Sequence, residues 1–128
     1  NVMGHIGFTP QFKKKFRVEG KNKNEQKKLI NHAKKIEQAG AFSIVLECVS
    51  KLTAKKITKL LKIPTIGIGS SNFCDGQILV TDDLLGISGF YPKFVKKYAN
   101  LEKIIENAVN KYSKEVKSNQ FPKNRNSF

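Results

Sequence analysis

The sequence lacks several features that would place it in a well-defined class of protein. No run of about 18 apolar residues occurs in its 128 residues, so a membrane-spanning helix is not expected. The opening residues NVMGHIGF do not have the basic and apolar regions of a secretory signal. The only two cysteines, Cys48 and Cys74, match no zinc-ligand spacing. We therefore expect a cytoplasmic protein with reduced thiols, without a metal held by cysteine and without a membrane partner.

Arginine is scarce although the formal net charge is +14. Of the 24 basic side chains, only Arg17 and Arg125 are arginine, so the two-pronged contacts that arginine makes to phosphate and guanine are nearly missing. The lysines are spread along every predicted helix, which is typical of solvated faces rather than of one binding surface. We expect no nucleic-acid partner, and a basic α/β module that binds nucleic acid is the alternative function.

An initiator methionine is missing from the start of the chain. The only methionine, Met3, lies inside a predicted strand. We therefore expect residues 1–128 to be a piece of a longer protein. The length and the apolar content of 39% suit a single domain with a core of its own.

Short apolar runs predict four strands. They cover residues 2–7, 42–46, 65–68 and 77–80. Between and after them, residues 12–23 are predicted to form a basic loop, residues 81–99 an irregular stretch and residues 118–128 a loose polar tail.

Apolar residues at helical spacing predict three helices. The first is capped by Asn24 and stopped by Gly40. The second is capped by Ser50 or Thr53 and ends at Pro64. Its side chains Ile57, Leu60 and Leu61 are expected to face inward. The third is capped by Asn100 and carries a long apolar stripe from Leu101 to Val116.

Apolar strands that alternate with amphipathic helices predict an α/β fold with a parallel sheet. Two architectures fit this pattern: a small open α/β sheet, and half of a (β/α)8 TIM barrel, which usually needs about 250 residues. Both place functional groups at the carboxyl ends of the strands, where His5, Glu47 and the loop after Ile68 lie.

Glu47 is the main candidate for chemistry because it ends a buried strand, Phe42 to Leu46. Burying a carboxylate is costly, and the run Ile44-Val45-Leu46 would withdraw it from water and favour its use as a general base. The other interpretation is a carboxylate paired with a lysine at the end of the strand.

Two histidines differ in their surroundings. His5 lies between two glycines at the end of a strand, which favours either a contact with a ligand or a contact that stabilises the loop. His32 lies in the middle of a helix and is expected on a solvated face.

Two further patterns are weak. The run Gly67 to Ser71 can cradle a phosphate, but it lacks a Walker or dinucleotide pattern and favours a tight loop. Three aspartates, Asp75, Asp82 and Asp83, do not have the spacing of a calcium loop.

Several segments together resemble the ketopantoate hydroxymethyltransferase family over essentially the whole chain. They are GHIGFTPQ (4–11), FRVEGK (16–21), AGAFSIVLECV (39–49), IPTIGIG (63–69), CDGQILV (74–80), DLLG (83–86) and PKFVKKYANL (92–101). The resemblance implies a TIM barrel about twice as long, with residues 1–128 as the C-terminal half of its single domain.

The same resemblance implies the reaction. A one-carbon unit passes from 5,10-methylenetetrahydrofolate to 3-methyl-2-oxobutanoate, a 2-oxo acid bound by Mg²⁺, and gives 2-dehydropantoate for pantothenate biosynthesis. Glu47 matches the proton acceptor of the family, and His5 matches a residue that binds the substrate. The resemblance places the Mg²⁺ ligands in the absent first half, assigns no folate contact here, and implies an inactive fragment and a homo-oligomeric whole protein.

The chain departs from the family at two places. Ser70-Ser71 stand where the family commonly has Ala-Gly, which leaves the shape of that loop open. Asp82-Asp83 stand where it commonly has His-Asp, so no role of that histidine carries over.

Overall fold

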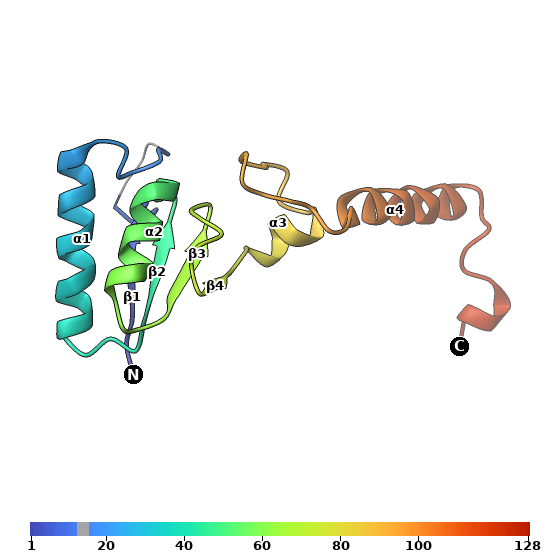
Figure 1. Ribbon diagram of the computed structural model, residues 1–128. Coiled ribbons are helices and arrows are strands. Elements are labelled where there is room, and N and C mark those ends of the chain that lie inside the picture. The colour runs from blue at the N-terminus through green and yellow to red at the C-terminus, as the bar shows by residue number, and fades with distance from the viewer. Residues whose placement is uncertain (13–15) are drawn as a thin grey trace. The chain divides into compact units, whose positions relative to one another are not determined.

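The computed structural model describes residues 1–12 and 16–128. The chain forms two compact units, residues 1–79 and residues 80–128, which are described separately (Figure 1).

The first unit is built on a four-stranded parallel sheet with the strand order β1-β2-β3-β4. Its strands are β1 (Met3–Gly7), β2 (Ser43–Glu47), β3 (Thr65–Ile68) and β4 (Gly76–Gln77). Helix α1 (Lys23–Gln38) joins β1 to β2, and helix α2 (Lys51–Leu60) joins β2 to β3. The predicted α/β class with a parallel sheet is therefore confirmed.

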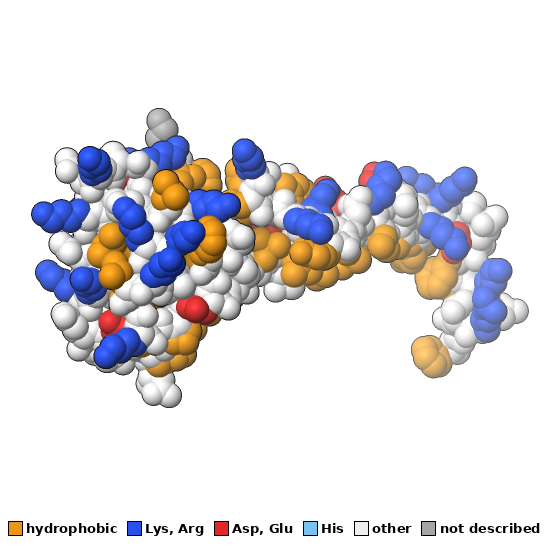
Figure 2. All heavy atoms as spheres, viewed as in Figure 1, with side chains coloured by type: hydrophobic (Ala, Val, Ile, Leu, Met, Phe, Trp, Pro, Cys, Tyr) orange, Lys and Arg blue, Asp and Glu red, His pale blue; other side chains and the backbone are white. Residues whose placement is uncertain are grey.

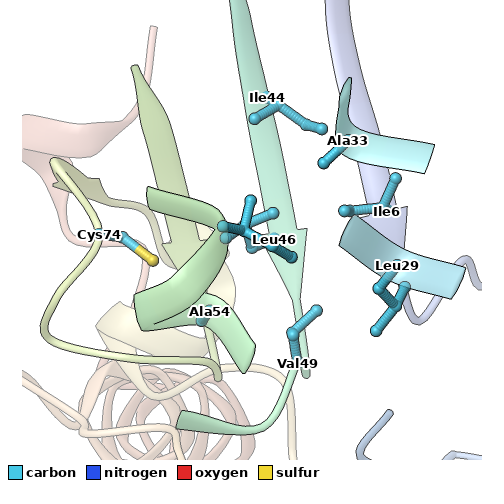
Figure 3. Close-up of a cluster of buried hydrophobic side chains, with 9 residues drawn as sticks. Ile6, Leu29, Ala33, Ile44, Leu46, Val49, Ala54 and Cys74 are labelled. Carbon is cyan, nitrogen blue, oxygen red and sulfur yellow. The ribbon is translucent and has the colours of Figure 1, made fainter. Parts of the chain in front are cut away.

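Helices α1 and α2 pack on one face of this sheet and form the core with it (Figure 3). The core includes, from the strands, Ile6, Ile44 and Leu46, and from the helices, Leu29, Ala33, Ala54 and Ile57. Ile44 and Leu46 have no solvent-exposed surface. Burial of one such side chain contributes about 1.5–3 kcal/mol, so β2 is the central support of the unit.

The other face of the sheet carries the alternate residues of each strand, because successive side chains of a strand point to opposite sides. Met3 on β1, Val45 on β2 and Ile66 on β3 belong to this face and are exposed or half-buried. His5 and Glu47 lie on the same face. The face that α1 and α2 leave uncovered is therefore the one that presents ionisable groups.

Glu25 fastens the loop between β1 and α1. Its carboxylate accepts hydrogen bonds from the N–H groups of Gly20 and Lys21, at 2.9 and 3.3 Å, and contacts Arg17 at 3.2 Å. Burial works against ionisation of Glu25, but these backbone donors, together with Arg17, outweigh it and lower the pKa of this carboxyl. The loop is thereby fixed to the first turn of α1.

The start of α1 differs from the prediction. Asn22, and not Asn24, caps the helix: its side chain accepts the N–H of Glu25 at 2.9 Å while its backbone is extended. Asn24 lies inside the first turn. Either asparagine has a suitable side chain, and the anchoring of the preceding loop by Glu25 decides between them.

Two predictions near α2 and β4 were wrong. Leu60 is half-exposed at the end of α2 rather than turned inward, whereas Ile57 is buried as predicted. The fourth strand covers Gly76–Gln77 and not residues 77–80, because the chain leaves the sheet edge and begins the short helix α3 (Thr81–Leu85). Ile78 and Val80 are consequently exposed.

The second unit contains α3, in a stretch predicted to be irregular, and the long helix α4 (Leu101–Lys117). Asn100 precedes α4 as predicted, but its side chain makes no capping hydrogen bond. The apolar stripe of α4 is exposed at Ile104, Ile105, Val109, Tyr112 and Val116. The predicted loose tail includes a short 3-10 helix, η1 (Asn124–Asn126).

Lysine and arginine side chains are scattered over the face in Figure 2, as the spread of lysine along the sequence predicts. Among the helices of residues 1–12 and 16–128, none is long and apolar enough to cross a membrane.

We predict that Gly7→Ala lowers the free energy of unfolding more than Gly40→Ala. Both glycines have a positive φ, +96° and +90°, so alanine costs about 1–2 kcal/mol at either position. At Gly7 the added Cβ would also overlap the carbonyl oxygen of Glu47 and lie 2.7 Å from Val49, whereas at Gly40 it would meet nothing within 4 Å. Overpacking adds about 1–3 kcal/mol at Gly7 alone. Urea unfolding measures the difference, and equal losses would contradict the close approach of β1 to Glu47.

Candidate functional site

Glu47 and His5 come together at the carboxyl end of the sheet. Gly7 is the register partner of Glu47, and His5 is two residues earlier on the same strand and the same face. His5 Nε2 lies 3.0 Å from Glu47 Oε2, and the two side chains are 35% and 17% exposed. Because Gly7 has no side chain, nothing on β1 stands between them. The predicted site residues therefore form one pair.

This pair changes both interpretations left open by the sequence. The group facing Glu47 is the imidazole of His5, whereas the sequence suggested a lysine. His5 contacts a carboxylate of the neighbouring strand and holds it in place. His32 lies on the exposed side of α1, as predicted.

The backbone just after Glu47 leaves the regular strand. Cys48 has φ +52°, a left-handed conformation that costs a non-glycine residue about 1–2 kcal/mol. Segments from other parts of the unit hold it: Cys48 donates its N–H to Ile68 at 2.9 Å and accepts the N–H of Glu19 at 2.9 Å. Phe8 donates to the carbonyl of Glu47 at 2.8 Å. The end of β2 is therefore fixed from both of its neighbouring strands.

Ser70, in the loop after β3, makes the other contact at this point. Its hydroxyl donates to the carbonyl of Leu46 at 2.6 Å and accepts the N–H of Val49 at 2.9 Å. No local sequence pattern indicates this role, because it depends on a loop 21 to 24 residues away that closes over the end of β2. The serines of the run Gly67 to Ser71 bond to the protein itself: the Ser71 hydroxyl accepts the N–H of Phe73 at 3.2 Å.

The thiol of Cys48 is buried beside Glu47. Burial and the adjacent negative charge of Glu47 raise the pKa of Cys48 to about 11, so the thiol is neutral at physiological pH. Burial also raises the pKa of Cys74. Both cysteines are free, in agreement with the expectation of reduced thiols. Because the thiolate is the nucleophilic form, Cys48 is a packing residue.

Asp75 has a structural contact. Its carboxylate accepts both the N–H and the hydroxyl of Thr65, at 2.8 and 2.9 Å, and these hydrogen bonds lower the pKa of Asp75. It therefore ties the loop after β3 back to the start of that strand. Within residues 1–12 and 16–128, no group of three or more His, Cys, Asp or Glu side chains could hold a metal ion.

Comparison with known proteins gives the family. The family profile described as ketopantoate hydroxymethyltransferase matches residues 1–124. The chain belongs to this family. Its similarity to the family thus extends over both units, and the resemblance noted in the sequence is confirmed.

Curated relatives carry the name 3-methyl-2-oxobutanoate hydroxymethyltransferase. The chain is 50% identical over 127 residues to the enzyme of Pelagibacter ubique, which covers 99% of the chain and 49% of the relative. It is 51% identical over 131 residues to that of Thermotoga maritima and 52% identical over 128 residues to that of Sulfolobus acidocaldarius. These two alignments cover 99% and 98% of the chain and 48% of each relative. The chain therefore spans about half the length of these relatives, which are transferases.

We predict that Cys48 resists alkylation in the folded protein. At pH 8.5 a thiol with a pKa of about 11 has a thiolate fraction at least about 100-fold below that of an unfolded cysteine. Iodoacetamide labelling followed by mass spectrometry of the Cys48 peptide should show a correspondingly slow rate that rises with pH up to about 11. The same peptide in guanidinium is the control. Equal rates in the folded and unfolded protein would contradict the buried position of the thiol.

Proposed function

We propose that the protein containing this chain transfers a hydroxymethyl group from 5,10-methylenetetrahydrofolate to 3-methyl-2-oxobutanoate and yields 2-dehydropantoate. Glu47 is the proton acceptor and His5 its partner, which also contacts the substrate. The observation that carries the proposal is the placement of Glu47 at the carboxyl end of a parallel sheet, 3.0 Å from His5, in a chain of this family. This reaction assigns the protein to pantothenate biosynthesis, and we expect it in the cytoplasm.

The geometry suits removal of a proton from carbon. A C–H bond next to a carbonyl is weakly acidic, and a carboxylate held in a fixed orientation within reach of it can accept the proton. His5 Nε2 contacts Oε2 of Glu47, so Oε1 of Glu47 is the oxygen that accepts the proton from C3 of the oxo acid. The electron pair of the broken C–H bond then forms the new C–C bond to the methylene carbon of the folate. Both C–N bonds of that methylene group break, a water molecule supplies the hydroxyl oxygen, and tetrahydrofolate leaves with its two nitrogens protonated. His5 fixes the orientation of the carboxylate during this transfer.

The described residues of this chain do not form a set of ligands for Mg²⁺. Within residues 1–12 and 16–128, the acidic and histidine side chains do not gather as a metal site. The residues present therefore do not fit a Mg²⁺ centre, and we propose that the ligands of Mg²⁺ belong to the rest of the protein. In this chain Glu47 accepts the proton and His5 orients the carboxylate. We propose that residues 1–128 by themselves are inactive, because they hold the proton acceptor without such a site.

We infer that the sheet is the C-terminal half of a (β/α)8 barrel. The support is the consecutive order of four parallel strands with α1 and α2 on a single face, which is the repeating unit of a barrel. Within the described residues β1 has β2 as its strand partner, and a hollow of about 420 Å³ that His5, Ile6 and Gly7 help to line lies beside it. An exposed strand edge invites pairing, and the first half of the barrel would supply the partner strand for it. We also propose that the whole protein is a homo-oligomer.

The alternative, a module that binds nucleic acid, rests on net charge alone. Family membership and the Glu47–His5 pair favour the transferase. Binding of duplex DNA or RNA with a steep salt dependence near physiological salt would reverse this preference.

We predict that Glu47→Gln in the full-length protein slows hydrogen–deuterium exchange at C3 of 3-methyl-2-oxobutanoate by about 100-fold or more. Glutamine keeps the shape of the side chain but cannot accept the proton, so binding of the oxo acid should persist. NMR of the oxo acid in D₂O measures the exchange. Glu102→Gln, an exposed change in the first turn of α4, should exchange at the wild-type rate. Wild-type exchange by Glu47→Gln would remove Glu47 from the role of base.

We predict that His5→Ala lowers kcat/KM by about 5- to 150-fold, the effect of about 1–3 kcal/mol for one lost polar contact. The loss arises because the Glu47 carboxylate is no longer oriented and the substrate loses a contact. Steady-state kinetics and thermal unfolding are measured together, with His32→Ala on the exposed side of α1 as the matched control. Unchanged kinetics with a lower Tm would show that His5 only stabilises the loop.

A further inference from the structure

We propose that a hollow between α4 and η1 is a binding site for a small phosphate ester. The hollow has a volume of about 590 Å³, and the cationic side chains of Lys111, Lys123 and Arg125 help to line it. All three residues belong to the second unit. This site goes beyond the transfer of a hydroxymethyl group and does not depend on it.

A tight reversal of the chain after α4 gives the hollow its shape (Figure 1). Asn119 has φ +58°, the left-handed conformation that asparagine tolerates just after a helix. It donates its N–H to the carbonyl of Val116 at 3.1 Å, and Gln120 donates its N–H to the carbonyl of Glu115 at 2.8 Å. These two bonds form a Schellman motif, which ends the helix and turns the chain back.

The residues after the reversal stay beside the helix. The ring of Phe121 packs edge-on against that of Tyr112 on α4, with 5.5 Å between the ring centroids. In η1, Asn126 donates its N–H to the carbonyl of Lys123 at 2.7 Å and accepts the N–H of Lys123 through its side-chain oxygen at 3.4 Å. The wall of the hollow is therefore held by hydrogen bonds within the second unit.

Arg125 offers a guanidinium that has no acidic partner. The other arginine of the chain, Arg17, contacts Glu25 at 3.2 Å. In the part of the chain that the structure describes, residues 1–12 and 16–128, no carboxylate forms an ion pair with Arg125. A guanidinium keeps its charge at physiological pH, and its planar fork matches two oxygens of a phosphate group. Arg125 is thus the side chain of the hollow that is best suited to hold such a group.

The charge of the hollow also matches a phosphate ester. Lys111, Lys123 and Arg125 share the hollow with one carboxylate, that of Glu115, which lies 4.0 Å from Lys111. One carboxylate against three cations leaves two positive charges for a ligand. A phosphate monoester carries a charge of about −1.5 to −2 at pH 7 and has three acceptor oxygens, so it balances this excess.

The size of the hollow favours an ester over the free phosphate ion. Sites for small molecules usually have volumes of about 300–1,000 Å³, so 590 Å³ leaves room for an organic group beside the phosphate. Phe121 lines the same hollow and is 37% exposed, which gives that group an apolar surface to contact. We therefore expect a ligand with a phosphate at one end and an apolar group at the other.

The test measures binding to the full-length protein by isothermal titration calorimetry at low salt, because salt screens exposed charges. The probes are phenyl phosphate, inorganic phosphate and glutarate, a dianion whose charge is divided between two carboxylates. Arg125→Gln is compared with Lys117→Gln. Both changes remove one positive charge near the end of α4, but Lys117 does not line this hollow.

We expect phenyl phosphate to bind the wild-type protein with a Kd of about 1 mM or lower. Inorganic phosphate should bind about 3-fold more weakly, because it makes no apolar contact, and glutarate about 10-fold more weakly. Arg125→Gln should weaken binding of phenyl phosphate by about 10-fold or more, and Lys117→Gln by less than about 2-fold.

Three results would overturn the proposal. The first is no binding of phenyl phosphate by the wild-type protein. The second is equal weakening by Arg125→Gln and Lys117→Gln, which would show a general attraction to a basic surface. The third is equal affinity for inorganic phosphate or for glutarate, which would show that the hollow does not select a phosphate ester.

A second measurement locates the bound probe. Phenyl phosphate should shift the side-chain Nε–Hε resonance of Arg125 in NMR spectra and leave that of Arg17, which contacts Glu25, in place. Because all the changed side chains are exposed, the variants should fold like the wild-type protein. An unshifted Arg125 resonance would overturn the proposal even if calorimetry detected binding.

Discussion

The first unit depends on one constraint, the alternation of side chains between the two faces of its parallel sheet. On β2, Ile44 and Leu46 point towards α1 and α2 and are fully buried. Val45 and Glu47 necessarily point the other way. On β1 the same alternation buries Ile6 and places His5 on the opposite face of the sheet. Packing of one face and presentation of ionisable groups on the other are therefore a single property of these strands, and a slip of register by one residue would exchange them.

Most of the fold of the first unit followed from local patterns. Helical spacing, apolar runs and punctuation by glycine and proline predicted α1, α2 and three of the strands, because these elements are stabilised by the periodic burial that such patterns describe. The prediction failed where a contact distant in sequence decides the outcome. Glu25 binds the preceding loop and moves the cap of α1 to Asn22, and the length of β4 depends on where the chain turns away to form α3.

The candidate site could be predicted in part for the same reason. A carboxylate at the end of a buried strand and a histidine between glycines are visible locally, and the carboxyl ends of parallel strands meet at one edge. The bond between His5 and Glu47 requires the register of β1 against β2, which the sequence does not specify. Ser70 was noted only as a departure from the family, and its bridge was not predicted, since the partners of its hydroxyl lie at the end of another strand.

The contacts that hold the end of β2 also bear on the order in which the protein folds. The groups that bind residues 46–49 come from Phe8, Glu19, Ile68 and Ser70, on both sides of β2 in the chain. Contacts between residues so far apart form only after the intervening helices have brought the strands together, and contacts of this kind slow folding. The pairing of β1 with β2 has the same requirement, since it joins residues as far apart as Met3 and Ser43, whereas each helix can form from near neighbours. The carboxylate of Glu47 thus acquires its orientation only when the three strands β1, β2 and β3 have come together, and before that step the glutamate has no fixed geometry.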